Sequence, residues 1–168
     1  MPDFRSQVGR ATRRMRSVFP VTPLQRNDFL SAKYRAEIYL KREDLSPVRS
    51  YKIRGAFNAI VKALDAGETG PFVCASAGNH AQGVAFVCAH FDVKAVIFMP
   101  VTTPQQKVHK TEVFGGAQAE IRLEGDYFDE TLSAAQAYCA EEGAVFVPPF
   151  DSDDVIEGQA TVAAEIAE

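Results

Sequence analysis

Lys52 and the run Ser76-Ala77-Gly78-Asn79-His80 carry the residue types in this chain that could do chemistry. Lys52 lies at the expected start of a helix, where the helix dipole presents positive charge and disfavours an ammonium group. Arg54 places a second positive charge nearby, and both effects would favour the neutral amine that attacks a carbonyl. Gly55 would leave room for a flat ring. The pattern predicts a covalent cofactor site, although an ordinary exposed lysine fits the same spacing.

The helix that must position Lys52 is expected over residues 52–66. Ser50 can cap it by accepting a backbone N–H bond. Its apolar face is marked by residues at helical spacing, which are Ile53, Ala56, Phe57, Ile60 and Leu64.

The Ser76–His80 run is expected to connect a buried strand over 71–75 to a helix over 79–91. In open α/β sheets, ligands bind outside the carboxyl ends of the strands. Free N–H groups at a helix start suit a carboxylate or a phosphate, and Gly78 would allow a tight turn and close approach. The same residues also fit a plain strand–helix turn in which Asn79 caps the helix and His80 is packed.

Four stretches in this order resemble one known family. They are residues 41–56 (KREDLSPVRSYKIRGA), 75–85 (ASAGNHAQGVA), 147–151 (VPPFD) and 156–161 (IEGQAT). They are similar to the signatures of fold-type II pyridoxal-phosphate enzymes, and closest to the threonine dehydratase branch. The resemblance covers roughly residues 18 to 168.

The resemblance implies a role for each matching residue. Lys52 would hold pyridoxal 5'-phosphate covalently and, once released, would remove the α-proton of the substrate. Tyr51 would lie near the cofactor ring, and Asn79 would hydrogen-bond its 3′-oxygen. The substrate carboxylate would be held by Ser76, Ala77, Gly78, Asn79 and His80. The implied reaction converts L-threonine to 2-oxobutanoate and ammonia, in isoleucine biosynthesis.

Ala77 separates some alternatives within the family. Serine racemases resemble this loop but usually carry a second serine at this position, which serves as the base on the opposite face. Alanine cannot transfer a proton, so elimination is favoured over racemisation. A serine dehydratase or racemase, or a non-catalytic binding module with this fold, stays open as an alternative. Threonine and serine are not distinguished, since both present a β-hydroxyl to the same loop.

The rest of the chain alternates strands and helices. Strands are expected at 37–41, 72–75, 94–99, 119–123 and 144–147. Helices are expected at 52–66, 79–91 and 153–167, from 103 to the glycine pair at 115–116, and from 126 through at least 139. Thr103 and Asp126 are the expected caps of the two helices that begin there. Gly115-Gly116 should end the helix that Thr103 begins. This order predicts an α/β fold with a parallel sheet and helices on both faces.

The resemblance adds a tryptophan synthase beta-like division into lobes. Residues 71–148 would form the small lobe, whereas 1–70 and 149–168 would be part of a large lobe. The family's glycine-rich phosphate loop is expected beyond Gly158, and Gly115-Gly116 is the only adjacent glycine pair. We therefore expect the front half of a catalytic unit, inactive alone and with exposed apolar surface.

Composition limits the other function classes. The chain is 46% hydrophobic with a formal net charge of −4, which gives no case for nucleic-acid binding. No apolar run reaches the length of a membrane span. Three widely spaced cysteines fit a reduced, cytoplasmic protein, and three histidines lack metal-site spacing. The expected partners are an amino-acid substrate and, for the full-length protein, identical subunits.

The N-terminal segment is rich in arginine, and Asp3 is its only acidic residue before Asp28. This composition is typical of a packing or solvated helix, and organelle-targeting segments share it. A helix ahead of the catalytic region is the interpretation that we favour.

Overall fold

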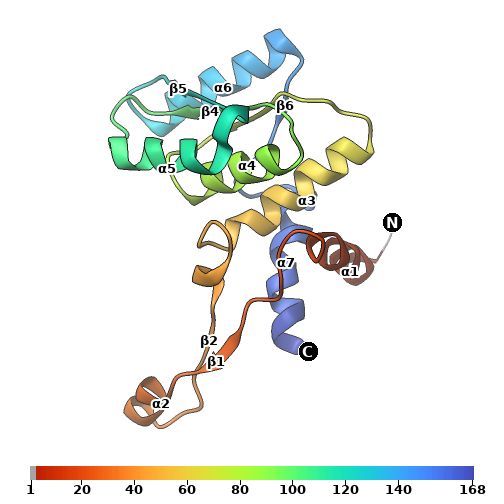
Figure 1. Cartoon of the computed structure of the whole chain (residues 1–168), viewed down its shortest axis with the longest axis vertical. Coiled ribbons are helices and arrows are strands. Elements are labelled where there is room, and N and C mark those ends of the chain that lie inside the picture. Colours follow the sequence, from red (N-terminus) through yellow and green to blue (C-terminus); the bar gives the residue numbers. More distant parts are fainter. Residues whose placement is uncertain (1–2) are drawn as a thin grey trace.

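A computed structural model describes residues 3–168 of the chain (Figure 1). The α-helices are α1 (Phe4–Met15), α2 (Asp28–Tyr34), α3 (Lys52–Asp65), α4 (Asn79–His90), α5 (Gln105–Gly115), α6 (Phe128–Glu142) and α7 (Asp153–Ala167). The strands are β1 (Leu24–Arg26), β2 (Tyr39–Lys41), β3 (Phe72–Ala75), β4 (Ala95–Met99), β5 (Ala119–Leu123) and β6 (Val145–Phe146). Short 3-10 turns occupy Glu43–Leu45 and Gly116–Gln118.

Four strands form a parallel sheet in the order β5-β4-β3-β6. The central strands β3 and β4 are buried at every position, as their continuous apolar runs predict. Their side chains alternate between two cores: Phe72 and Ile97 join one cluster, whereas Val73 and Phe98 join the other. The prediction of a parallel sheet inside an α/β fold is confirmed.

Helices cover both faces of the sheet, which confirms the second part of the fold prediction. Helix α6 lies on one face, and α4 and α5 lie on the other (Figure 1). Helix α3 packs between α4 and α7, so it connects the sheet to the remaining helices. Helix α1 packs on α7 and α3 through Val8, Ala11 and Met15, so the arginine-rich segment is a packing helix as favoured.

A separate arm, β1–α2–β2, extends away from the sheet (Figure 1). Strands β1 and β2 pair antiparallel, with Leu24 opposite Lys41. The side chain of Asn27 caps α2 by accepting the N–H of Leu30 at 2.8 Å. Only the strand around 37–41 was predicted here, and the structure shortens it to Tyr39–Lys41.

Two predicted helix caps are wrong. The Thr103 hydroxyl is buried and, among the described residues, has no hydrogen-bond partner, because α5 begins two residues later at Gln105. Helix α6 begins at Phe128, and Asp126 instead donates its backbone N–H to Glu130 at 2.7 Å. The stop at Gly115-Gly116 is confirmed, since Gly116 follows α5 with φ of 53°.

Between residues 3 and 168, no helix combines the length and the apolar character that crossing a bilayer requires.

Candidate active site

Lys52 is the first residue of α3, as predicted. The Ser50 hydroxyl accepts its backbone N–H at 3.3 Å, so Ser50 satisfies a free donor at the helix start. The Lys52 side chain is half-buried, and its Nζ donates a hydrogen bond to the Pro149 carbonyl at 2.6 Å. The amine is thus held in place at one end while it stays reachable from solvent.

A cavity of about 350 Å³ lies beside this amine. Tyr51, Lys52, Pro149, Phe150 and Gln159 are among the residues that line it. The Lys52 Nζ lies 5.9 Å from the centre of the exposed Tyr51 ring. The Gln159 Oε1 is buried and has no hydrogen-bond partner among residues 3–168.

The Ser76–His80 loop leads from β3 into α4 at the carboxyl edge of the sheet. Ser76 donates its N–H to the Phe98 carbonyl at 2.9 Å, and its hydroxyl accepts the Gly78 N–H at 3.2 Å. Gly78 precedes α4 without a side-chain cap, so the proposed capping by Asn79 does not occur. Within the described part of the chain, the first N–H groups of α4 have no hydrogen-bond partner, so they are available to an anion.

Gly78 has a φ of −137°, so its conformation does not itself require glycine. A Cβ at this position would meet only the Ser76 hydroxyl, at 3.9 Å. The chain bends at residues 77 and 78, and the open space beside Gly78 is consistent with close approach of a ligand.

His80 is buried, and its Nε2 lies 2.9 Å from the Val147 carbonyl. Burial lowers the pKa of His80 to about 4, the Val147 carbonyl opposes this shift, and the charge of Lys52 adds to it. His80 is therefore neutral at pH 7. Its Nδ1 is buried and finds no partner within the described part of the chain.

One short segment, Val147–Pro149, links the two predicted motifs. Its Val147 carbonyl contacts His80 from the loop, and its Pro149 carbonyl contacts Lys52 from α3. The backbones also meet directly: a Cβ on Gly83 of α4 would lie 3.3 Å from the Ile53 backbone. The structure therefore brings Lys52 close to the start of α4, although the loop opens into a different cavity.

Gly55 does not make room for a ring, which corrects the sequence-based interpretation. A Cβ there would lie 2.8 Å from both Val155 and Gln159. A Cβ on Gly158 would lie 2.4 Å from the Arg54 carbonyl. These two glycines let α3 and α7 cross closely, so Gly55 has a packing role.

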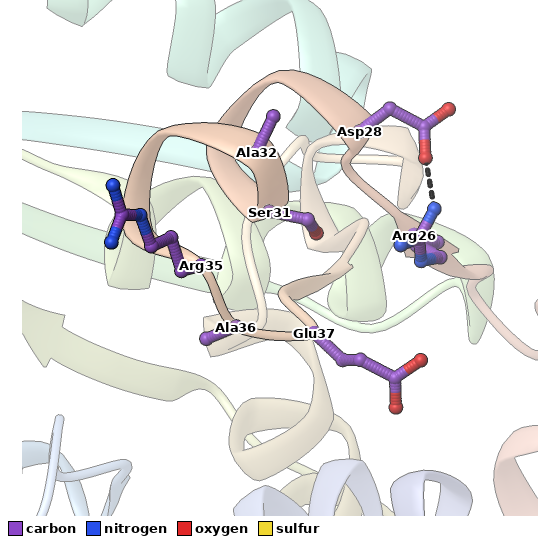
Figure 2. Close-up of a pocket in the computed structure, with 7 residues that line it drawn as sticks. All are labelled: Arg26, Asp28, Ser31, Ala32, Arg35, Ala36 and Glu37. Carbon is purple, nitrogen blue, oxygen red and sulfur yellow. Dashed lines mark hydrogen bonds and ion pairs between the residues drawn. The ribbon is translucent and has the colours of Figure 1, made fainter.

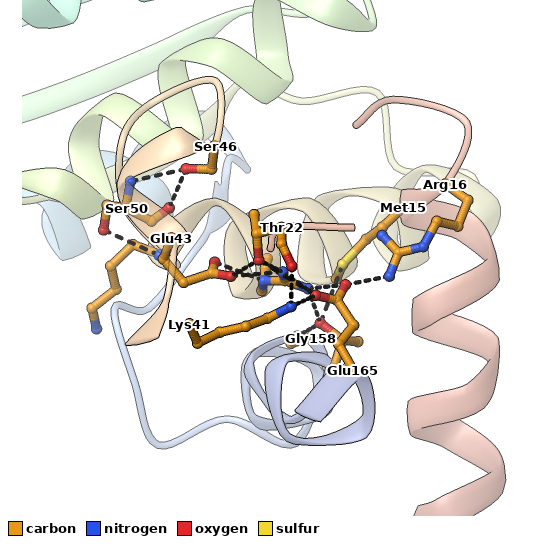
Figure 3. Close-up of polar contacts among 12 residues, drawn as sticks. Met15, Arg16, Thr22, Lys41, Glu43, Ser46, Ser50, Gly158 and Glu165 are labelled. Carbon is orange, nitrogen blue, oxygen red and sulfur yellow. Dashed lines mark hydrogen bonds and ion pairs between the residues drawn. The ribbon is translucent and has the colours of Figure 1, made fainter. Parts of the chain in front are cut away.

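Arg54 does not act on Lys52 as an uncompensated charge, which is a second correction. Its guanidinium is fully buried and bonded to Glu43 at 2.8 Å and to Glu165 at 2.8 Å. Lys41 adds a contact to Glu165 at 2.6 Å, and Arg16 also pairs with it (Figure 3). The network joins α1, β2, α3 and α7, so it fixes the helix that carries Lys52.

Glu165 is ionised in this network. Burial alone would raise its pKa, but hydrogen bonds from Arg54, Lys41 and Arg16 outweigh that effect and lower its pKa to about 2. The pKa of Arg54 is raised. Burial alone would lower this pKa, but the bonds to Glu43 and Glu165 outweigh burial. This network was not predicted, because Arg54 lies outside the predicted apolar face of its helix and its partner Glu165 is 111 positions away.

Another cavity, of about 560 Å³, lies at the tip of the arm (Figure 2). The residues that line it include Arg26, Asp28, Arg35 and Glu37, together with short side chains from α2. Arg26 pairs with Asp28. None of the predicted site residues lines this cavity, so it is not part of the candidate active site.

The residues beside Lys52 fit pyridoxal phosphate. A primary amine with one backbone partner faces a cavity, and an aromatic ring lies next to it. The free N–H groups at the start of α4 provide donors for a carboxylate or a ring oxygen. An aldehyde cofactor requires a reachable amine of this kind.

Comparison with known proteins gives consistent results. The model of the pyridoxal-phosphate dependent enzyme family matches residues 16–168. The L-threonine dehydratase biosynthetic IlvA of Lactococcus lactis is 51% identical over 152 residues, which cover 90% of this chain and 36% of that protein. The chain thus spans about a third of that relative's length.

Solved structures agree with this result. The processed form of threonine deaminase isoform 2 from Solanum lycopersicum superposes with a TM-score of 0.87 and 36% identity, covering 97% of this chain and 44% of that one. Maize serine racemase gives a TM-score of 0.89 at 27% identity, covering 96% and 48%.

Proposed function

Since this chain belongs to the family of pyridoxal-phosphate-dependent enzymes, we propose that it supplies the cofactor lysine of a threonine dehydratase. The whole protein would convert L-threonine to 2-oxobutanoate and ammonia, as a step in isoleucine biosynthesis. The names of the curated relative and of the tomato structure support threonine as the substrate.

The observation that carries the proposal is the position of the Lys52 amine. Its Nζ lies at a cavity, is held by a single carbonyl and starts a helix that a buried ion network fixes.

Pyridoxal phosphate, when bound, supplies a ring that withdraws electrons from the α-carbon of the amino acid. Lys52 would bind the cofactor through Nζ and later accept the α-proton at the same atom. The N–H groups of the Ser76–His80 loop would orient the substrate carboxylate, and Asn79 would hydrogen-bond the 3′-oxygen. Tyr51 would flank the ring. The β-hydroxyl would then leave as water.

Ala77 supports elimination over racemisation. A racemase needs a second group that exchanges a proton on the opposite face of the substrate, and a methyl side chain has none to exchange. The neutral His80, with its Nε2 engaged by Val147, is not available as a proton donor at pH 7.

The proposal extends to the organisation of the whole protein. Residues 71–148, which contain the complete β5-β4-β3-β6 sheet, would form the small lobe, and 1–70 with 149–168 would belong to the large one. The protein would act in the cytoplasm, as a homo-oligomer.

The first test traps the cofactor on the chain. Pyridoxal phosphate is added, the imine is reduced with borohydride, and the modified residue is identified by mass spectrometry. Lys52 should be the dominant site, and Lys52→Arg should lose it. Lys33→Arg, at an exposed lysine of α2, is the matched control and should leave the labelling of Lys52 unchanged.

The second test supplies the rest of the enzyme. Residues 16–168 replace the matching segment of the Lactococcus lactis relative, and 2-oxobutanoate formed from L-threonine is measured. The chimera should be active and its Lys52→Arg variant inactive. The proposal would be refuted if both chimeras were equally active. It would also be refuted if surface lysines were labelled to the same extent as Lys52 in the first test.

A further inference from the structure

The segment that follows β6 is fixed where it leaves the sheet. Val147 is buried, and its N–H donates to the Val73 carbonyl of β3 at 2.7 Å. Its own carbonyl lies 2.9 Å from the Nε2 of His80. Both polar groups of the Val147 backbone therefore have partners, one from the sheet and one from α4.

The next two residues, Pro148 and Pro149, make this segment stiff. A proline ring locks φ and leaves no N–H, and a residue that precedes proline is restricted to extended conformations. Val147 and Pro148 both precede a proline, so the chain has few alternative paths from one residue to the next. The position of the Pro149 carbonyl therefore follows that of Val147.

The imidazole of His80 is the only side chain that holds the Val147 carbonyl within the described part of the chain. A carbonyl only accepts hydrogen bonds, so Nε2 must carry the hydrogen, and Nδ1 of the neutral ring keeps the lone pair. His80 is 3% exposed, and its Nδ1 has no partner among residues 3–168. A second hydrogen at Nδ1 would be a buried donor without an acceptor, so the structure favours the neutral ring with Nε2–H as donor.

The far end of the same segment holds the Lys52 amine. Nζ donates to the Pro149 carbonyl at 2.6 Å, which is its one hydrogen bond to residues 3–168. Helices α3 and α4 pack closely, since a Cβ on Gly83 would lie 3.3 Å from the Ile53 backbone. His80 and Lys52 thus lie at the starts of two packed helices and share one stiff segment as their common partner.

We propose that His80 is a positioning residue for the Lys52 amine. Its Nε2–H holds the Val147 carbonyl, and the two prolines pass this constraint to the Pro149 carbonyl that binds Nζ. Its value for catalysis rests on the proposed function, whereas the coupling of the two side chains does not. The role belongs to the imidazole, and it is separate from ligand contacts of the backbone N–H groups in the loop.

The test measures the reactivity of each lysine in the 168-residue chain without cofactor. The chain is treated with a trace of acetic anhydride, and acetylation is quantified by mass spectrometry, with the exposed Lys33 as internal reference. Lys52 should react more slowly than Lys33, because Nζ must leave the Pro149 carbonyl before it can attack.

Two substitutions of His80 separate its hydrogen bond from its bulk. His80→Phe keeps an aromatic ring but removes the donor, so the ratio of Lys52 to Lys33 acetylation should rise about fivefold, which corresponds to one lost hydrogen bond. His80→Gln places an amide N–H near the position of Nε2, so the ratio should stay close to that of the unmodified chain. A purely structural role of the ring would not distinguish these two variants by the reactivity of a distant amine.

Control variants make the result decisive. Ile60→Val loosens a fully buried position of α3 that is remote from the segment, and it should leave the ratio unchanged. If His80→Phe does not fold, Pro148→Ala removes one restraint on the segment and should raise the ratio in the same direction. The proposal is overturned if the ratio does not rise in the folded variant, or if Ile60→Val raises it as much.

The outcome is independent of the cofactor experiment. If borohydride traps no pyridoxal phosphate on Lys52 of the unmodified chain, the proposed function fails, and the acetylation ratio still decides the role of His80. If trapping succeeds and the ratio does not respond to His80→Phe, only the positioning role fails.

Discussion

Replacing Gly158 by alanine tests whether the close crossing of α3 and α7 shapes this molecule. A Cβ at Gly158 would lie 2.4 Å from the Arg54 carbonyl oxygen and 2.8 Å from the Gly55 Cα. Both are backbone atoms of α3, so no side-chain rotation can relieve the contact. Since ordinary contacts begin near 3.4 Å, the two helices must separate by about 1 Å.

The expected loss of stability follows from two opposing terms. Forcing an extra methyl group into a packed core costs about 1–3 kcal/mol, and a rigid backbone neighbour places this case at the upper end. Alanine in place of glycine inside a helix returns roughly 1 kcal/mol. The free energy of unfolding should therefore fall by about 2 kcal/mol.

Urea unfolding followed by far-UV circular dichroism measures this change, since the chain has no tryptophan for fluorescence. Gly9→Ala is the matched control: its Cβ would meet nothing closer than Arg13, at 3.7 Å. In this variant only the higher helix propensity of alanine acts, so the free energy of unfolding should rise by up to about 1 kcal/mol. The two variants should differ by roughly 3 kcal/mol.

The opposite outcome is that Gly158→Ala is as stable as the unmodified chain while Gly9→Ala gains stability as expected. That result would mean that α7 moves away from α3 at no cost, and that the glycine contact does not determine the crossing.

Two further predictions concern pH and charge. The pKa of His80 is lowered to about 4 in the folded chain, so as pH falls the unfolded chain takes up a proton at His80 before the folded chain does. The free energy of unfolding should therefore fall by about 3 kcal/mol as pH drops from about 6.5 to 4. His80→Gln should flatten this part of the urea-derived profile, whereas exposed His109→Gln should not; equal profiles would exclude His80 as the cause. Glu165→Gln leaves the buried Arg54 poorly compensated and should cost about 3–5 kcal/mol in the same assay near pH 7, while exposed Glu141→Gln should cost almost nothing. The stability that Glu165 contributes should be lost below about pH 4.5 as it protonates toward its pKa of about 2, and a loss below 1 kcal/mol for Glu165→Gln would contradict the network's importance.

The sheet and its helices were predictable because their patterns are local. The apolar run in β4 and the helical spacing in α3 identify each element within a few residues of its true bounds. The bounds of β5 (Ala119–Leu123) and α7 (Asp153–Ala167) match the prediction at both ends. Capping was harder to predict, since the choice between Thr103 and Pro104 depends on how the preceding turn packs.

The arm and the ion network could not be predicted from local pattern. Strands β1 and β2 are three residues long, too short for an alternation to show. Arg54 and Glu165 are separated by 111 positions, and nothing near either residue indicates the other. Only the fold brings α3 and α7 together, so burial of the guanidinium is a tertiary effect.

The candidate site was predicted only where its signals are local in the sequence. Lys52 at a helix start and the small-residue loop after β3 are local signals, and the structure places them as expected. The roles given to Arg54 and Gly55 were wrong because both residues face α7, which is 100 residues away in the sequence. The carbonyls of Val147 and Pro149 carry no side-chain signal, so their contacts were not foreseeable.

The distance along the chain between Arg54 and Glu165 also has a consequence for synthesis on the ribosome. Until Glu165 has emerged, Arg54 has Glu43 but lacks Glu165 as a carboxylate partner, so complete burial of the guanidinium is unfavourable before that point. The strands between residues 72 and 146 need no such partner and can assemble first. The docking of α3 against α7 is therefore completed late, so the sheet can form before the helix that bears Lys52 is fixed on both sides.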